Sequence, residues 1–196
     1  MSISQTIPLF PLSVFLLPGE KIALHIFEQR YQELLKHVEE KQSNFGIPFI
    51  REIGDLKYGS LMRLVEVKKR YISGESDIIV ECVGLFKLVE FNPKDPEFLF
   101  PSGNIIELQQ YNSWSASETL QEEWNIFQET SMPQGTPLIT NPLKMMSALG
   151  SNFEEKYNFI LLADREKQEQ KVLQLAKYQR LIQNQVAQVN RGFFPN

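Results

Sequence analysis

Residues 7–31 read IPLFPLSVFLLPGEKIALHIFEQRY, and this stretch decides how the chain begins to fold. The dipeptide Pro18-Gly19 divides it into two apolar runs, and Pro-Gly pairs mark tight turns. Prolines within the first run fit a strand start or a sheet edge, because proline has no amide hydrogen to donate. The stretch therefore predicts two short strands joined by a turn.

After this stretch the spacing of the apolar residues changes twice. Within residues 27–41 they recur every three or four positions with charges between them, which predicts an amphipathic helix. From Phe45 to about Gln109 the spacing returns to two over several β-prone runs, and residues 71–77 have the composition of a hairpin turn. Five or more strands with one early helix predict a small closed or half-closed barrel.

From Trp114 onward the sequence predicts helices. The pairs Ser115–Glu118 and Ser151–Glu154 have the spacing of capping boxes at helix starts, and residues 132–144 form a proline-rich interruption between them. Asp164 is placed to cap a final helix longer than about 25 residues. We expect that helix to pack on the preceding ones through apolar residues at intervals of three and four, which are Leu175, Tyr178, Ile182, Val186 and Val189.

The bulk composition is that of a folded chain without a basic character. Of 196 residues, 42% are hydrophobic and 22% charged, and the net charge is −4. A nucleic-acid partner is therefore not expected, because such proteins usually present a basic face. Residues 7–17 lack the basic lead of a signal peptide, and no apolar run reaches the roughly 20 residues of a membrane span. We expect a cytoplasmic protein that does not contact membranes.

The sequence contains no recognisable catalytic or cofactor-binding motif. It has no Gly-x-x-x-x-Gly-Lys-Ser/Thr loop, no Gly-x-Ser-x-Gly elbow and no His-Glu-x-x-His. Its histidines, His25 and His37, do not suggest a metal site. Cys82, the single cysteine, lies in an apolar strand and fits a small buried side chain better than a nucleophile. We therefore expect no catalytic, cofactor or metal site, with an enzyme of unrecognised type as an open alternative.

Several charged and aromatic groups allow a structural or a binding interpretation. Lys68-Lys69-Arg70 is the one basic run, and a solvated strand end is a more frequent meaning of such a run than phosphate binding. Trp124 fits the core stripe of a helix. Phe193-Phe194 is less easily buried, and it would either dock back on the domain or bind a partner.

Three motifs near the N-terminus resemble the opening signature of the Lon N-terminal domain family. They are Pro8-Leu9-Phe10-Pro11-Leu12, Leu17-Pro18-Gly19 and Leu24-His25-Ile26-Phe27-Glu28-Gln29-Arg30-Tyr31. Two later segments resemble further strands of that family, namely Gly59-Ser60-Leu61 with Leu64-Val65-Glu66-Val67, and Gly84 with Phe86 and Leu88. This chain has Leu85 where the family often has arginine. The chain is identified as a stand-alone member of this family, that of the ATP-dependent protease La domain.

The resemblance implies an α+β fold, in which a PUA-like β-barrel with one early helix precedes a C-terminal α-helical bundle. We expect the barrel in residues 1–113 and the helical subdomain in residues 114–196, together forming one Lon N-terminal-like domain. The resemblance also implies a non-catalytic module that recognises protein substrates, in the manner of the Lon protease in protein quality control. The ATPase and protease parts of Lon have no counterpart in this sequence.

The expected partner is an unfolded or extended polypeptide, or a partner protein. It would bind in an apolar groove or pair with an exposed strand edge. RNA binding through the barrel is the alternative, and a homo-oligomer is left open. The candidate residues for contact with the partner are His25, Glu28, Arg30, Tyr31, Phe193 and Phe194. For His25, Glu28 and Arg30, the densest polar group in an apolar setting, the favoured interpretation is a structural role that ties the helix start to neighbouring strands.

Overall fold

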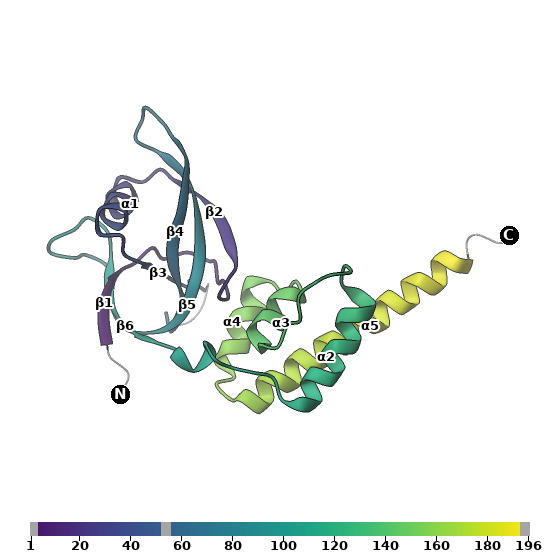
Figure 1. Cartoon of the computed structure of the whole chain (residues 1–196). Coiled ribbons are helices and arrows are strands. Elements are labelled where there is room, and N and C mark those ends of the chain that lie inside the picture. Colours follow the sequence, from purple (N-terminus) through teal and green to yellow (C-terminus); the bar gives the residue numbers. More distant parts are fainter. Residues whose placement is uncertain (1–3, 52–55, 193–196) are drawn as a thin grey trace. The chain divides into compact units, whose positions relative to one another are not determined.

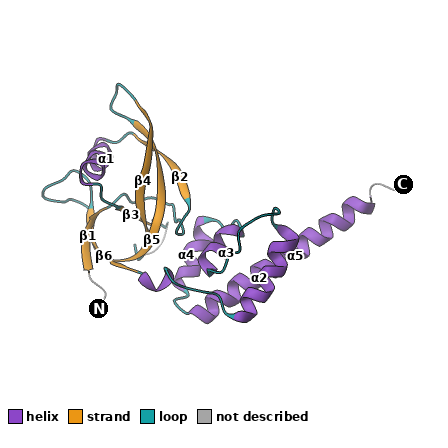
Figure 2. Ribbon diagram, in the orientation of Figure 1, coloured by secondary structure: helices purple, strands orange, loops and turns teal. Residues whose placement is uncertain are grey.

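A computed structural model describes residues 4–51 and 56–192 of the chain. The chain divides into two compact units, Met1–Asn112 and Ser113–Asn196. The first is built on a β-sheet and the second on helices (Figure 1, Figure 2). The fold is thus α+β, with an antiparallel sheet followed by helices, as the sequence predicted.

The first unit contains a six-stranded sheet, the helix α1 (Gln29–Lys41) and a short 3-10 helix, η1 (Gln109–Tyr111). The strands are β1 (Ser4–Pro8), β2 (Lys21–Ile26), β3 (Phe45–Pro48), β4 (Tyr58–Arg70), β5 (Ser76–Asn92) and β6 (Ser102–Glu107). Their hydrogen-bonded order is β1-β6-β5-β4-β3, and β2 pairs with the first part of β5. All of these pairs are antiparallel. The long strand β5 therefore joins most of the sheet.

The chain that follows β1 closes the sheet. Leu9 and Leu12 form parallel bridges to Gly46 and Phe49, and the backbone N–H of Phe10 donates to the Gly46 carbonyl at 2.8 Å. Since β1 and β3 stand at the two ends of the strand order, these bridges link one end to the other. The sheet is the small closed barrel that the alternation of apolar residues predicted.

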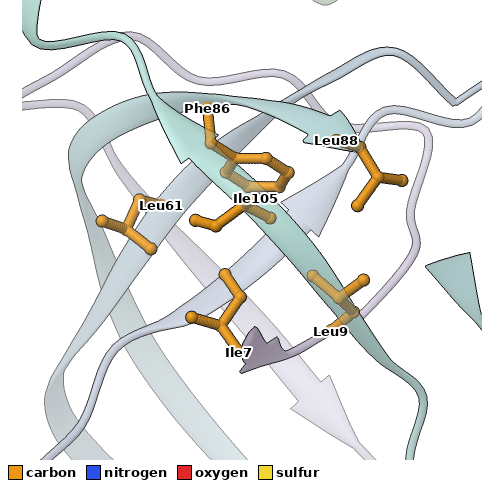
Figure 3. Close-up of a cluster of buried hydrophobic side chains, with 6 residues drawn as sticks. All are labelled: Ile7, Leu9, Leu61, Phe86, Leu88 and Ile105. Carbon is orange, nitrogen blue, oxygen red and sulfur yellow. The ribbon is translucent and has the colours of Figure 1, made fainter. Parts of the chain in front are cut away.

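The inside of the closed sheet is filled by aliphatic and aromatic side chains from several strands (Figure 3). The cluster consists of Ile7, Leu9, Leu61, Phe86, Leu88 and Ile105. Its packing leaves no room at Gly46, where an added Cβ atom would lie 2.6 Å from Leu9 Cδ2 and 2.9 Å from Phe86 Cε1. Helix α1 buries Tyr31, Leu34, Leu35 and Val38, four of the five residues that the spacing placed on its apolar face. The fifth, Phe27, was wrongly placed there, because it precedes the helix and is 61% exposed.

The second unit consists of four helices in the described part of the chain. They are α2 (Glu118–Ser131), α3 (Pro142–Ala148), α4 (Phe153–Leu161) and α5 (Arg165–Gly192). Trp114, Trp124 and Phe127 are buried in this unit. Trp124 therefore belongs to the core, as its position in a helical stripe predicted.

The predicted capping boxes at Ser115 and Ser151 are wrong by a small shift. Ser117 is the N-cap of α2, and its hydroxyl accepts a hydrogen bond from a backbone N–H three residues on. This start places Glu118 in the first turn, where a negative charge suits the helix dipole. Asn152 and Glu155 form the capping box of α4. Asn serves there as well as Ser, because its side-chain oxygen accepts the same amide hydrogen.

The proline-rich interruption was predicted to extend over residues 132–144, but its predicted end is wrong, because helix α3 begins at Pro142. The Asn141 side chain accepts hydrogen bonds from the Leu143 and Lys144 backbone N–H groups, and Pro142 occupies the first helical position. Proline is favoured there because the N–H that it lacks would have no partner within the helix.

Helix α5 packs on its neighbours from its start to about Arg180, where the Gln179 side chain donates to the Leu149 carbonyl at 2.6 Å and Arg180 pairs with Glu123. Asp164 caps it, accepting from the Lys167 backbone N–H at 3.1 Å, and Val172 and Ala176 are buried. The predicted stripe was expected to be buried along the whole helix, but Tyr178, Ile182, Val186 and Val189 are 41–61% exposed. The reason is length, because α5 has 28 residues and its main partner α2 has 14.

Candidate functional site

Strand β2 follows the Pro-Gly turn predicted from the sequence, but the predicted strand that leads into this turn is wrong, because β1 ends at Pro8 and pairs with β6. The Glu20 N–H donates to the Leu17 carbonyl at 3.0 Å across Pro18 and Gly19, and Gly19 has a φ of +95° that favours glycine. Gly19 N–H donates to the Cys82 carbonyl, and Cys82 N–H donates to the Glu20 carbonyl. This is a bulge with glycine at its first position, and it fixes the register of β2 on β5.

One edge of β2 carries no neighbouring strand in the described part of the chain, since β2 pairs with β5 alone. Backbone groups of an antiparallel strand point alternately to one side and the other. Because Glu20 bonds to β5, every second residue after it also bonds to β5. The residues that direct N–H and C=O groups to the open edge are therefore Lys21, Ala23 and His25.

The side chains of the same three residues, Lys21, Ala23 and His25, are exposed on the outer face of the sheet. Their neighbours in sequence turn inward, with Ile26 fully buried at the end of the strand. An open edge of this kind can pair with another chain, and proteins usually blunt it with charge, proline or a covering segment. β2 contains no proline, and Ala23 in its centre is the smallest chiral side chain.

A hydrogen-bonded network holds His25 at the end of this edge. His25 Nδ1 donates to Asp77 Oδ1 at 2.7 Å, and the Tyr71 hydroxyl donates to Asp77 Oδ2 at 2.7 Å. The hydrogen bonds from His25 and Tyr71 hold the pKa of Asp77 below its usual value, and the bond to Asp77 raises the pKa of Tyr71. His25 Nε2 lies 3.7 Å from Glu75 Oε2. The network fixes both rings beside the open edge.

Exposed apolar groups adjoin this network. Phe27 is 61% exposed, and its ring lies 6.0 Å from that of His25, at an angle of 20°. Ile72, at the tip of the β4–β5 hairpin, is fully exposed. Lys69 Nζ lies 4.3 Å from the centre of the Tyr71 ring. The end of β2 thus offers aromatic surface, a carboxylate and backbone groups that point away from β5 together.

The other residues expected to contact a partner lie in different environments. Arg30 Nη2 is 2.7 Å from Glu28 Oε2 in an exposed ion pair, and the Arg30 guanidinium lies over the Tyr31 ring. Tyr31 is buried, with its ring 4.1 Å from that of Phe10, and burial raises its pKa. Phe193 and Phe194 lie outside the described residues.

Cys82 has the surroundings of a structural side chain. It is buried, and its thiol lies 3.3 Å from the Leu16 carbonyl and 3.2 Å from the Gly84 carbonyl. Burial raises the pKa of Cys82 to about 12, so the thiol stays protonated at neutral pH. The interpretation of Cys82 as a small buried residue is confirmed.

The basic run at the end of β4 is compensated by neighbouring groups. Lys68 Nζ lies 2.7 Å from Glu66 Oε2, Arg70 forms an ion pair with Glu39, and Lys69 stacks on the Tyr71 ring. These contacts fit the interpretation as a solvated strand end.

Metal-ligating side chains do not cluster within residues 4–51 and 56–192, where no group of three or more His, Cys, Asp and Glu could hold an ion. His37 instead packs edge-on against Phe98 and Phe100, at 4.9 and 5.4 Å. None of the helices in the described ranges is long and apolar enough to cross a membrane.

A pocket of about 450 Å³ lies in the second unit, at the end of α2. The Gln128 side chain in its wall already donates to the Thr136 and Pro137 carbonyls, at 3.0 and 2.9 Å. The Gln128 amide is therefore already engaged within the wall, which makes this pocket a weaker candidate than the β2 edge.

Comparisons with known proteins cover most of the chain. Residues 6–190 match the profile of the ATP-dependent protease La (LON) substrate-binding domain. A Lon N-terminal domain protein from Xanthomonas campestris has a similar structure, with a TM-score of 0.68 and 17% sequence identity over 86% of this chain and 97% of that one. The N-terminal domain of the Mycobacterium avium complex Lon protease gives a TM-score of 0.63 and 11% identity over 88% and 98%. The curated proteins contain no match. The chain belongs to the family of the ATP-dependent protease La (Lon) substrate-binding domain.

Proposed function

We propose that this chain is a non-catalytic recognition module that binds extended segments of other proteins along the open edge of β2. The observation that carries the proposal is that edge, where Lys21, Ala23 and His25 direct backbone groups away from the sheet. The description of the family as a substrate-binding domain supports a protein as the ligand.

Pairing with β2 suits weak, reversible capture. Three outward residues offer up to six backbone hydrogen bonds to an added strand, each contributing about 0.5–1.5 kcal/mol net. Ordering the peptide costs about 1–2 kcal/mol per residue and offsets most of this gain. The backbone bonds alone therefore give a dissociation constant no tighter than about 1 mM, and side-chain contacts must supply further affinity and set the preference. Unfolded proteins expose such segments, whereas folded proteins keep them paired.

This binding fits a role in selecting proteins for degradation in the cytoplasm, in trans with a separate protease. Neither nucleic acid nor a membrane is required for it. The paired state of Lys68, Lys69 and Arg70 argues in the same direction, because phosphates would have to displace existing partners.

Backbone methylation of a bound peptide tests the proposal. Fluorescence anisotropy measures the affinity of a fluorescein-labelled heptapeptide and of two N-methylated versions of it. One version carries the backbone methyl groups at the odd inner positions, and the other carries them at the even inner positions. An added strand uses only alternate N–H groups to pair with β2. One methylated version should lose at least about tenfold in affinity and the other should keep it, whereas equal affinities would contradict edge pairing.

A substitution on the protein provides the complementary test. Ala23→Pro removes an outward N–H without removing a bond to β5, so the fold should persist while binding falls. Ala23→Ser keeps the amide and serves as the matched control. If Ala23→Pro, with an unchanged circular dichroism spectrum, binds as the parent does, then β2 is not the binding edge.

A further inference from the structure

The outer face beside the open edge consists of three rows of side chains across β2, β5 and β4. Lys21 pairs in register with Glu81, and Glu81 with Arg63. Arg63 Nη2 and Glu81 Oε2 form an ion pair at 2.9 Å. His25 pairs with Asp77 in the outermost row. Both of these rows are polar.

On β2 and β5 the middle row is apolar, and its member on β4 is Glu66, which forms an ion pair with Lys68. Ala23 pairs in register with Ile79, which is partly buried on the same face. A methyl group thus stands at the edge between the longer side chains of Lys21 and His25. Residues directly opposite on adjacent strands have Cβ atoms about 5 Å apart, and large side chains reach further across the sheet. A bulky apolar residue placed opposite Ala23 can therefore lie over the methyl group and reach Ile79.

The row of side chains that contains His25 favours a positively charged side chain in the bound segment. Both oxygens of Asp77 are occupied by His25 and Tyr71, and Lys69 lies on the Tyr71 ring. The Glu75 side chain is 39% exposed, and its carboxylate lies 3.7 Å from Nε2 of His25, which carries charge only when protonated. Phe27 adds an exposed ring face, on which a guanidinium or ammonium group is attracted.

We propose that the β2 edge selects extended segments in which a bulky apolar residue lies two positions from an arginine or lysine. The spacing follows from the sheet, because residues two apart on an added strand lie opposite Ala23 and His25 on one face. This inference rests on the proposed function and adds the class of side chain to it.

Peptide selectivity tests the inference by fluorescence anisotropy. The parent peptides are threonine-rich heptamers with leucine and arginine two positions apart, in both orders, so that a parallel and an antiparallel strand are each represented. Replacing the leucine with serine should weaken binding about fivefold. Replacing the arginine with glutamate should weaken it about threefold, as expected for a partly exposed charge pair.

Charge reversal on the protein identifies the group responsible. Glu75→Lys should invert the preference, so that the glutamate peptide binds about threefold more tightly than the arginine peptide. Glu97→Lys, the same change in the exposed β5–β6 loop, should leave the preference as in the parent.

The outcomes separate this inference from the proposed function. Equal affinities for all peptides, or an unchanged preference in Glu75→Lys, would overturn the selectivity even if N-methylation still blocks binding at alternate positions. Insensitivity to N-methylation would overturn edge pairing itself, and with it this inference.

Discussion

Val172 and Val186 lie on the same helix, α5, in opposite environments. Val172 is 0% exposed, whereas Val186 is 54% exposed. Replacing each with alanine removes the same two methyl groups, so the comparison isolates burial. The pair therefore tests whether the part of α5 beyond Arg180 is uncovered.

The expected effects differ by more than the error of an unfolding experiment. At Val172 the loss of buried methyl groups, at about 0.8 kcal/mol each, together with the cavity left behind, should lower the free energy of unfolding by about 2–3 kcal/mol. At Val186 little buried surface is lost, and alanine is the better helix former. The Val186→Ala change should therefore stay within about 0.5 kcal/mol of the parent.

Tryptophan fluorescence during urea unfolding measures this difference directly. The two tryptophans of the chain, Trp114 and Trp124, are both buried in the second unit, so the signal reports on the unit that contains α5. Protein concentration should be varied to detect self-association. If Val186→Ala destabilised the unit as much as Val172→Ala does, the part of α5 beyond Arg180 would be covered and the exposure argument refuted.

Three further predictions concern the first unit. Gly46→Ala should lower the free energy of unfolding in urea by about 1–3 kcal/mol, because its Cβ would meet Leu9 and Phe86. Gly84→Ala is the control, because the nearest atom to its added Cβ lies at 3.8 Å, and it should lower that free energy by less than about 1 kcal/mol. Equal losses in the two variants would contradict the packing around Gly46. The thiol of Cys82 should react with a disulfide reagent at neutral pH only upon unfolding, since burial raises its pKa to about 12, and rapid labelling of the folded protein would disprove its burial. Tyr71→Phe should raise the pKa of Asp77 in an NMR titration, because the Tyr71 hydrogen bond lowers it. As the folded-state pKa of Asp77 is depressed, its contribution to stability is present above the unfolded-state pKa and is lost as the pH falls through the folded-state value. An unshifted titration in Tyr71→Phe would contradict the network.

The sheet and the early helix could be predicted because their apolar spacing is a local property. The change from the period of the 27–41 segment to the alternation after Phe45 marks the boundary between helix and strands. Helix boundaries that depend on a single capping hydrogen bond were predicted less accurately. The N-cap of α2 differs from the predicted serine because two serines near the helix start compete, and geometry selects Ser117.

The candidate site could be predicted only in part, because strand pairing is a long-range property. His25 was singled out from its polar surroundings, but Asp77, its partner, lies 52 residues away in the sequence. Nothing in the alternation of β2 shows that, among the residues that the structure describes, β2 would pair with β5 alone. The exposure of Val186 was missed for the same reason, since helical spacing does not reveal how far the partner helix extends.

The central claim is that a polypeptide pairs with the open edge of β2, and amide hydrogen exchange of β2 tests it most directly. In the free protein the amides of Ile22, Leu24 and Ile26 should be protected by β5, whereas those of Lys21, Ala23 and His25 should exchange rapidly. Adding the leucine–arginine peptide at saturating concentration should slow exchange at Lys21, Ala23 and His25. Unchanged exchange at these three amides in the presence of bound peptide would show that the peptide binds elsewhere.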